Sequence, residues 1–165
     1  AGLLGMRPDD ERIPDSFEIA RKMSLSYSFG IANLTSAHPN SVVLEVKGKS
    51  GRTLEVQACS LGGGRIMINR LDGLDVNCSC EIPTLIVHNL DQPGHVAEVT
   101  SMLAHKSVNI ANMSLYRDKR GGSAVMVVEM DQPLPKESLE WLEHLEGIVK
   151  VTYINVTEGE EDDVL

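Results

Sequence analysis

The second half of the chain alternates between strand-like and helix-like hydrophobic patterns. Short apolar runs of strand character are separated by stretches in which apolar residues recur at the spacing of one helix face. The predicted elements are strands at 83–89, 108–116, 123–130 and 148–156 and helices at 94–106 and 135–146. The order strand–helix–strand–strand–helix–strand predicts a ferredoxin-like fold, an antiparallel sheet covered on one face by two helices.

The first half of the chain has a less regular pattern. Asp15 or Ser16 is expected to cap a short helix that carries Phe17, Ala20 and Met23. Three strands are predicted at 41–46, 53–60 and 65–69, separated by glycine-rich turns. These elements predict a small unit of mixed helix and strand.

The two patterns together predict an α+β protein with two domains. A small α/β domain is expected over 1–78 and the ferredoxin-like domain over 83–156, with the polar stretch 77–82 as the linker. The acidic run at 157–165 is expected to be a solvated, disordered tail.

Composition excludes several classes of function. A formal net charge of −9 and an aromatic content of 4% argue against a nucleic-acid partner. No apolar stretch approaches the roughly 20 residues that span a bilayer, and the start shows no signal-peptide pattern. We therefore expect a cytoplasmic protein with no membrane partner. Because the chain opens with Ala1, we also expect that an N-terminal portion is missing.

The three cysteines, Cys59, Cys78 and Cys80, are not spaced as a disulfide framework or as a metal site. We expect reduced structural thiols, no metal and no cofactor on this chain. No residues are arranged as a nucleophile with its base, so no catalytic residue is predicted. Four histidines are expected on helix surfaces or in turns: His88, His95, His105 and His144.

The strongest candidate site is the turn between the strand at 83–89 and the following helix. Asn89 and Asp91 offer side-chain oxygens, and Gly94 lets the backbone approach a ligand closely. The helix start offers unpaired N–H groups, so the turn suits the ammonium and carboxylate of an amino acid. Asn109, at the start of the next strand, is expected to close the same site. In the alternative interpretation, Asp91 simply caps the helix.

A second candidate site lies in the first half. Consecutive glycines, Gly62, Gly63 and Gly64, allow backbone N–H groups to converge on an anion. His38 and Asn40, just ahead of the first strand, could add donors, and Ser41 at the start of that strand belongs to the same candidate site. The alternative interpretation is a glycine-rich β-turn with a structural histidine.

The pattern Asn89-x-Asp91-x-Pro93-Gly94, followed by a helix and then by Val108-Asn-Ile-Ala, resembles the ACT domain. ACT domains are small βαββαβ modules that bind amino acids, regulate metabolic enzymes and commonly pair, with the ligand at the domain interface. The resemblance implies a homodimer and carries over a set of ligand-binding positions. These are the side chains of Asn89, Asp91 and Asn109 and the backbone around Gly94, His95, Val96 and Ile110.

The ACT resemblance leaves the identity of the amino acid open. The serine-binding ACT domain of phosphoglycerate dehydrogenase reads His-x-Asn before Pro-Gly, where this chain reads Asn-x-Asp.

The first half resembles the allosteric substrate-binding domain of bacterial iron–sulfur L-serine dehydratases and of some phosphoglycerate dehydrogenases. The resemblance rests on His38-Pro-Asn-Ser41 and the three glycines; the family's usual Thr is Ser41 here. This domain followed by an ACT domain is similar to the β subunit of the two-subunit L-serine dehydratase. The resemblance implies an α subunit partner that holds a [4Fe–4S] cluster and forms pyruvate and ammonia. This chain would then be regulatory.

Two other functions stay open on the sequence. The chain could be a free-standing amino-acid sensor or a regulatory fragment of phosphoglycerate dehydrogenase, although it lacks the Gly-x-Gly-x-x-Gly motif of a dinucleotide-binding domain. An independent enzyme is the third interpretation, and nothing in the sequence positions a base or nucleophile for it.

Overall fold

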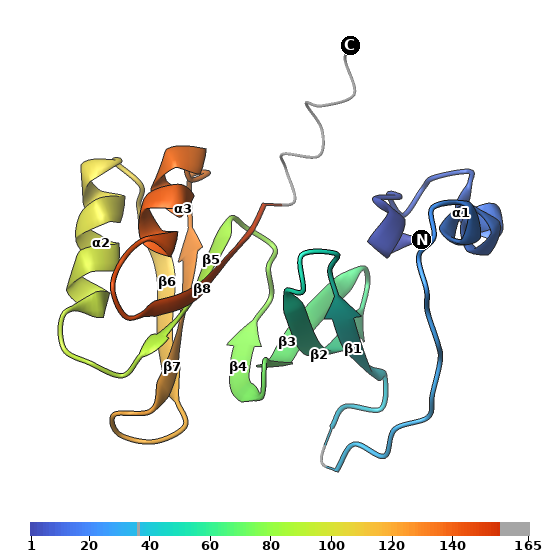
Figure 1. Ribbon diagram of the computed structural model, residues 1–165, viewed down its shortest axis with the longest axis horizontal. Helices are drawn as coiled ribbons and strands as arrows, with labels where there is room; N and C mark the ends of the chain where they lie inside the picture. Colours follow the sequence, from blue (N-terminus) through green and yellow to red (C-terminus); the bar gives the residue numbers. More distant parts are fainter. Residues whose placement is uncertain (36, 156–165) are drawn as a thin grey trace. The chain divides into compact units, whose positions relative to one another are not determined.

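The computed structural model describes residues 1–35 and 37–155 (Figure 1). The predicted tail at 157–165 lies outside these residues. The chain divides into two compact units, Ala1–Thr35 and Ser36–Leu165. None of the helices among the described residues is long and apolar enough to cross a membrane.

The first unit contains the short predicted helix, α1 (Ser16–Lys22), which begins after Asp15. Two short 3-10 helices, Gly2–Leu4 and Ile13–Asp15, precede it. Phe17 and Tyr27 stack with ring centroids 5.3 Å apart, and both rings remain about half exposed.

The second unit begins with a four-stranded antiparallel sheet in the order β1-β2-β3-β4. Its strands are β1 (Ser41–Lys47), β2 (Thr53–Gly62), β3 (Arg65–Leu71) and β4 (Leu74–Cys78). Three of these strands confirm the sequence analysis. The fourth, β4, was not predicted, and it includes the first two residues of the expected linker at 77–82. Asp72 and Gly73 both have positive φ, 46° and 84°, and form the two-residue turn that sends the chain back as β4.

The remaining elements form the predicted ferredoxin-like fold, with strand order β6-β7-β5-β8. The strands are β5 (Thr84–Leu90), β6 (Ile110–Arg117), β7 (Ser123–Met130) and β8 (Ile148–Ile154). The helices are α2 (His95–His105) and α3 (Lys136–Glu143), and both lie on the same face of the sheet (Figure 1). The predicted order βαββαβ is therefore confirmed.

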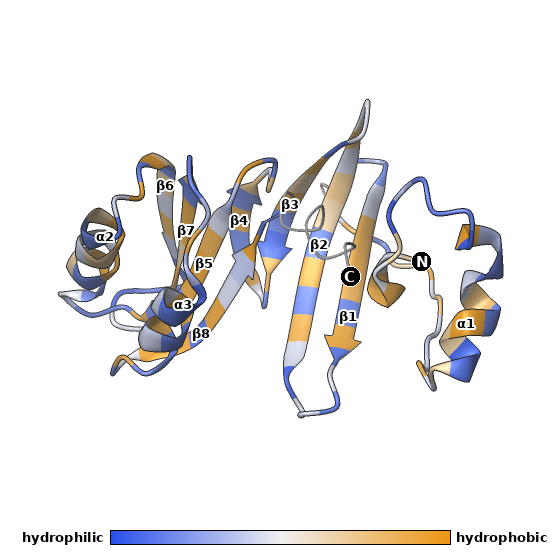
Figure 2. Ribbon diagram, turned by 90° about the horizontal axis from the view of Figure 1, so that it is seen from above, coloured by the Kyte–Doolittle hydropathy of each residue, from blue (hydrophilic) through white to orange (hydrophobic). Residues whose placement is uncertain are grey.

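The two central strands of this second sheet are buried on both faces. On the helix side, Leu85 and Val87 of β5 pack in one core with Leu103 of α2 and Leu142 of α3. The opposite face packs in a second core against the first sheet. That core contains Ile68, Leu71, Val76, Cys78 and Cys80 together with Ile86, Val125 and Val127. The hydrophobic colouring of β5 and β7 in Figure 2 follows this double burial. The β5 and β7 strands therefore form a layer between the helices and the first sheet.

Candidate functional site

The predicted turn between β5 and α2 contains a buried side-chain oxygen that has no hydrogen-bond partner in the described part of the chain. Asn89 is 4% exposed and lies, like Leu85 and Val87, on the helix-facing side of β5. Its Nδ2 donates to the carbonyl of Leu90 at 2.6 Å, but its Oδ1 has no hydrogen-bond partner among the described residues. A buried acceptor without a donor is costly, so this oxygen is suited to receive a hydrogen bond from a ligand or water.

Gly94, the residue immediately before helix α2, has a φ of 112°, a conformation that favours glycine. No side chain caps this helix, so the alternative in which Asp91 is the cap is wrong. The first backbone hydrogen bond runs from the Glu98 N–H to the carbonyl of Gly94 at 2.9 Å. The N–H groups of the first turn, which include His95 and Val96, are therefore available to an anionic group.

Asp91 is engaged in the loop that joins β6 and β7. Its carboxylate accepts hydrogen bonds from Arg117 Nη1 at 3.1 Å and from the Gly121 N–H at 2.9 Å. The hydrogen bond from Gly121 is the main cause that lowers the pKa of Asp91, with the ion pair to Arg117 adding to it. Asp91 thus connects the candidate site to the neighbouring loop.

His95, the first residue of α2, is buried rather than on the helix surface. Its Nδ1 lies 3.2 Å from Glu98 Oε2, and its buried Nε2 has no hydrogen-bond partner among the described residues. The ring packs against Gly147, where an added Cβ would lie 2.5 Å from Nε2. The expectation that His95 lies in an exposed position was therefore wrong.

Asn109 does not close this site within one chain. Ile110, the first residue of β6, pairs with Met130 at the end of β7, whereas Asn89 pairs with Ala124 near its start. Asn109 and Asn89 therefore lie at opposite ends of the sheet, and β7 separates their strands. Asn109 Nδ2 instead donates to Asp131 Oδ2 at 2.5 Å. The expected closure assumed that β6 lies beside β5, which the strand order contradicts.

The residues of the second candidate site gather at one end of the first sheet. The Ser60 N–H donates to the carbonyl of Asn40 at 3.0 Å, which places the start of β1 beside the end of β2. His38 Nδ1 accepts from the Asn40 N–H at 3.2 Å, and Ser41 Oγ donates to the His38 carbonyl at 2.6 Å. The three glycines of the β2–β3 hairpin begin two residues after Ser60 and all have positive φ: Gly62, Gly63 and Gly64.

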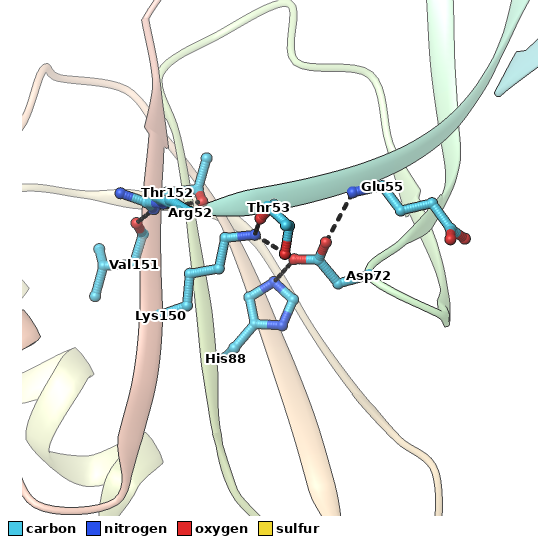
Figure 3. A network of polar contacts seen from close by, with 8 residues as sticks. All are labelled: Arg52, Thr53, Glu55, Asp72, His88, Lys150, Val151 and Thr152. Atoms are coloured by element: carbon cyan, nitrogen blue, oxygen red, sulfur yellow. Dashed lines mark hydrogen bonds and ion pairs between the residues drawn. The ribbon is translucent and has the colours of Figure 1, made fainter. Parts of the chain in front are cut away.

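A polar network that sequence analysis missed connects the two sheets (Figure 3). Lys150 of β8 donates to Asp72 Oδ2 and, at 3.1 Å, to the carbonyl of Thr53. Asp72 Oδ1 accepts from the Glu55 N–H at 2.9 Å. Arg52 Nη2 donates to the carbonyl of Val151 at 2.6 Å. The turns of the first sheet are thereby bound to the last strand of the second.

His88 of β5 faces the same network, with its Nε2 3.7 Å from Asp72 Oδ2. Burial is the main cause that lowers the pKa of His88. The negative charge of Asp72 opposes this effect, and the positive charges of Lys150 and Arg52 add to it. Burial alone would raise the pKa of Asp72, but hydrogen bonds from Lys150 and the Glu55 N–H outweigh it and leave that pKa below its usual value. The expectation of an exposed or turn position for His88 was wrong because the first sheet covers it.

The cysteines do not form a cluster site in the described part of the chain. Cys78 and Cys80 lie together, with their Sγ atoms 3.1 Å apart, and Cys59 lies in β2. No group of three or more His, Cys, Asp or Glu side chains that could hold a metal occurs among residues 1–35 and 37–155. The thiolate set that an iron–sulfur cluster needs does not fit this arrangement.

Comparison with known proteins places the chain in a family. The ACT domain family matches residues 83–146. The probable L-serine dehydratase beta chain of Bacillus subtilis is 33% identical over 153 residues, which cover 93% of this chain and 69% of that protein. The L-serine dehydratase beta chain of Peptoniphilus asaccharolyticus is 31% identical over 156 residues, or 94% of this chain and 70% of that protein.

A second group of relatives shares a smaller part of the chain. The D-3-phosphoglycerate dehydrogenase of Methanocaldococcus jannaschii is 31% identical over 90 residues, which cover 54% of this chain and 17% of that protein. The dehydratase relatives match nearly the whole chain, both sheets included, and the family follows from them. This chain belongs to the family of L-serine dehydratase beta chains and contains an ACT domain.

Proposed function

We propose that this chain is the regulatory and assembly subunit of a cytoplasmic L-serine dehydratase, which converts L-serine to pyruvate and ammonia. Its ACT domain binds L-serine or another small amino acid at the turn between β5 and α2. The observation that carries the ligand site is the buried Oδ1 of Asn89, which has no hydrogen-bond partner among the described residues. It lies a few residues before the uncapped start of α2.

The two halves of an amino acid suit two parts of this turn. The ammonium donates to Asn89 Oδ1, because that oxygen is buried and unsatisfied. The carboxylate accepts from backbone N–H groups at Gly94, His95 and Val96, where the helix dipole favours negative charge. Asp91 holds the β6–β7 loop beside the site and keeps free lone pairs for the ammonium.

A second copy of the chain supplies the other wall of the site. Asn109 and the backbone at Ile110 lie at the far end of the sheet from Asn89, so they reach a ligand only from a partner copy. The strands at the two edges of this sheet, β6 and β8, each pair with one strand only among the described residues, so ACT domains can associate through their outer sides. The proposed assembly is therefore a homodimer in which each site contains residues of both copies.

Catalysis is assigned to a separate α subunit. The described thiols of this chain do not assemble a cluster site. A [4Fe–4S] cluster on the α subunit would supply Lewis-acid activation of the serine hydroxyl. The role of this chain is to bind the effector amino acid and to hold the α subunit in its active assembly.

The glycine hairpin of the first sheet is proposed as the second, anion-binding site. Its glycines are exposed, and the segment that contains His38, Asn40 and Ser41 lies at the same end of the sheet. The backbone N–H groups of the hairpin suit the carboxylate of a substrate-like molecule. This site would allow the substrate itself to contact the regulatory chain.

Calorimetry on the purified chain tests the ACT site. L-serine should bind, and Asn89→Ala should weaken binding about tenfold or more, because one buried charge-assisted hydrogen bond is lost. Asn112→Ala is the matched control, since Asn112 is exposed and pairs with Glu129. Thermal melting without ligand separates loss of binding from loss of folding. Absence of heat with every amino acid tested, alone and with the α subunit, would contradict the sensing function.

Co-expression tests the assembly function. Under anaerobic conditions, the α subunit with this chain should form pyruvate from L-serine, and the α subunit alone should form much less. Unchanged activity of the α subunit without this chain would contradict the proposal.

The matches to phosphoglycerate dehydrogenases favour a second candidate, a free-standing amino-acid sensor. That candidate predicts amino-acid binding without any effect on dehydratase activity.

A further inference from the structure

Cys78 and Cys80 are a close thiol pair that the proposed function does not use. Cys78 ends β4, and Cys80 lies in the connection that leads to β5. Their Sγ atoms are 3.1 Å apart, and the residues are 2% and 7% exposed. They belong to the core that joins the first sheet to the ACT sheet.

The backbone brings the two sulfurs together. In an extended strand, residues two apart are separated by about 6.6 Å along the chain, because each residue rises about 3.3 Å. Cys80 instead has a φ of 55°, in the left-handed region that a cysteine rarely adopts. Ser79, between them, donates to Glu129 Oε1 at 3.3 Å and accepts from the Glu81 N–H at 3.4 Å. These contacts hold the turn that closes the thiol pair.

The two thiols differ in their ease of ionisation. The hydrogen bond from Cys80 lowers the pKa of Cys78. The same hydrogen bond, burial and the nearby Cys78 and Glu129 charges raise the pKa of Cys80. Cys78 therefore ionises more readily than Cys80, which is the difference that dithiol exchange requires between an attacking and a resolving thiol.

We propose that Cys78 and Cys80 form a redox-active dithiol that closes to an intramolecular disulfide by exchange with a low-molecular-weight disulfide. The Cys78 thiolate attacks one sulfur of the small disulfide, forms a mixed disulfide and releases one small thiolate. Cys80 then gives its proton to solvent and attacks Sγ of Cys78, which releases the second small thiol. The protein loses two electrons and the small disulfide gains them. Because both thiols are buried, exchange proceeds through local opening of the connection at 79–83.

Mass spectrometry on the purified chain tests this proposal. The reduced protein is incubated with oxidised glutathione, quenched and alkylated with N-ethylmaleimide in denaturant. Of the three cysteines, only Cys59 should then be alkylated. The tryptic peptide 71–106 contains Cys78 and Cys80 but not Cys59. Its mass should be lower by two hydrogens than that of the same peptide with two free thiols. Three alkylated cysteines at a large excess of oxidised glutathione would overturn the proposal, as would disulfides that only link two chains.

Single substitutions assign the two roles. Cys80→Ser should trap glutathione on Cys78, and Cys78→Ser should slow glutathione addition at the pair by about tenfold, because the thiolate is lost. Cys59→Ser is the matched control and should leave the internal disulfide unchanged. Equal rates of glutathione addition in the Cys78→Ser and Cys80→Ser proteins would contradict the assigned roles. The wild-type peptide measurement does not depend on the folding of any variant, nor on the proposed dehydratase function.

Discussion

Lys150 of β8 donates a hydrogen bond to Asp72 in the turn between β3 and β4, and this ion pair joins the two sheets. The side chains are only 15% and 24% exposed, so neither charge is fully solvated. Lys150 also donates to the carbonyl of Thr53, the first residue of β2, which directly follows the other turn at this end of the first sheet. The pair therefore holds two turns of one sheet against a strand of the other.

Removal of the cation should destabilise the chain. Lys150→Met leaves the Asp72 carboxylate half-buried without its cation, and the free energy of unfolding should fall by about 1–3 kcal/mol. Urea unfolding provides the measurement. Lys106→Met, at an exposed position after α2, should change stability by less than about 0.5 kcal/mol. Equal decreases in the free energy of unfolding of the two variants would show that the ion pair between Lys150 and Asp72 does not stabilise the chain.

The buried imidazole of His88 should make stability depend on pH. Burial lowers the pKa of His88 below the value of 6.5 that applies in the unfolded chain. The unfolded chain therefore binds the proton first, and stability that is present above pH 6.5 is lost as the pH falls toward the folded pKa. The pKa of Asp72 is lowered from 3.8, so its charge persists in this range.

Urea unfolding between about pH 5 and pH 7.5 would measure this effect. His88→Gln should flatten the dependence, whereas His105→Gln, at an exposed position on α2, should leave it unchanged. A His88→Gln protein with the same slope as wild type would contradict the assignment.

Gly147 should tolerate no side chain. An added Cβ would lie 2.5 Å from His95 Nε2, and φ is 80°. Gly147→Ala should therefore lower the free energy of unfolding by about 1–3 kcal/mol more than Gly51→Ala. Gly51 has a similar φ of 85° with no atom within 4 Å of its Cβ position, so it reports the backbone cost alone. Thermal melting gives both values, and restoration by a second change, His95→Ala, would identify the collision as the cause.

Asp91 should restrain the β6–β7 loop. Asp91→Ala removes the acceptor for Arg117 and for the Gly121 N–H, so trypsin should cut at Lys119 and Arg120 several-fold faster. Asp131→Ala, which removes the partner of Asn109 at the other end of the sheet, should leave this cleavage rate unchanged. Amino-acid binding separates the two roles of Asp91: if it contacts the ligand directly, Arg117→Met should weaken binding much less than Asp91→Ala.

The fold of the ACT domain could be predicted because each element carries a local signal. The continuous apolar run at 124–128 and the helical stripe of α2 define their elements without reference to the rest of the chain. Strand β4 was missed although Asp72-Gly73 is a strong signal for a two-residue hairpin. Leu74, Val76 and Cys78 alternate as the residues of one strand face do, but five residues give only a short pattern.

The candidate site could be predicted only in part, because its geometry depends on strand order. Asn89 and Gly94 follow directly from a local strand-to-helix pattern. The position of Asn109 depends on β6 pairing with β7 rather than with β5. The contact between Lys150 and Asp72 joins residues far apart in sequence, and no local pattern reports the register that brings them together. The partnership of Cys78 with Cys80 depends on the backbone conformation at Cys80.

Strand β7 is packed on both faces, which restricts the side chains that its positions can accept within the family. Val125 and Val127 contact the first sheet while Met126 and Val128 contact the helices, so a change in side-chain volume on either face disturbs a packed layer. Substitutions along this strand must satisfy two independent neighbours at once. Its residues should therefore be among the slowest to diverge, and a new residue on one layer should be accompanied by a matching change on the layer it contacts.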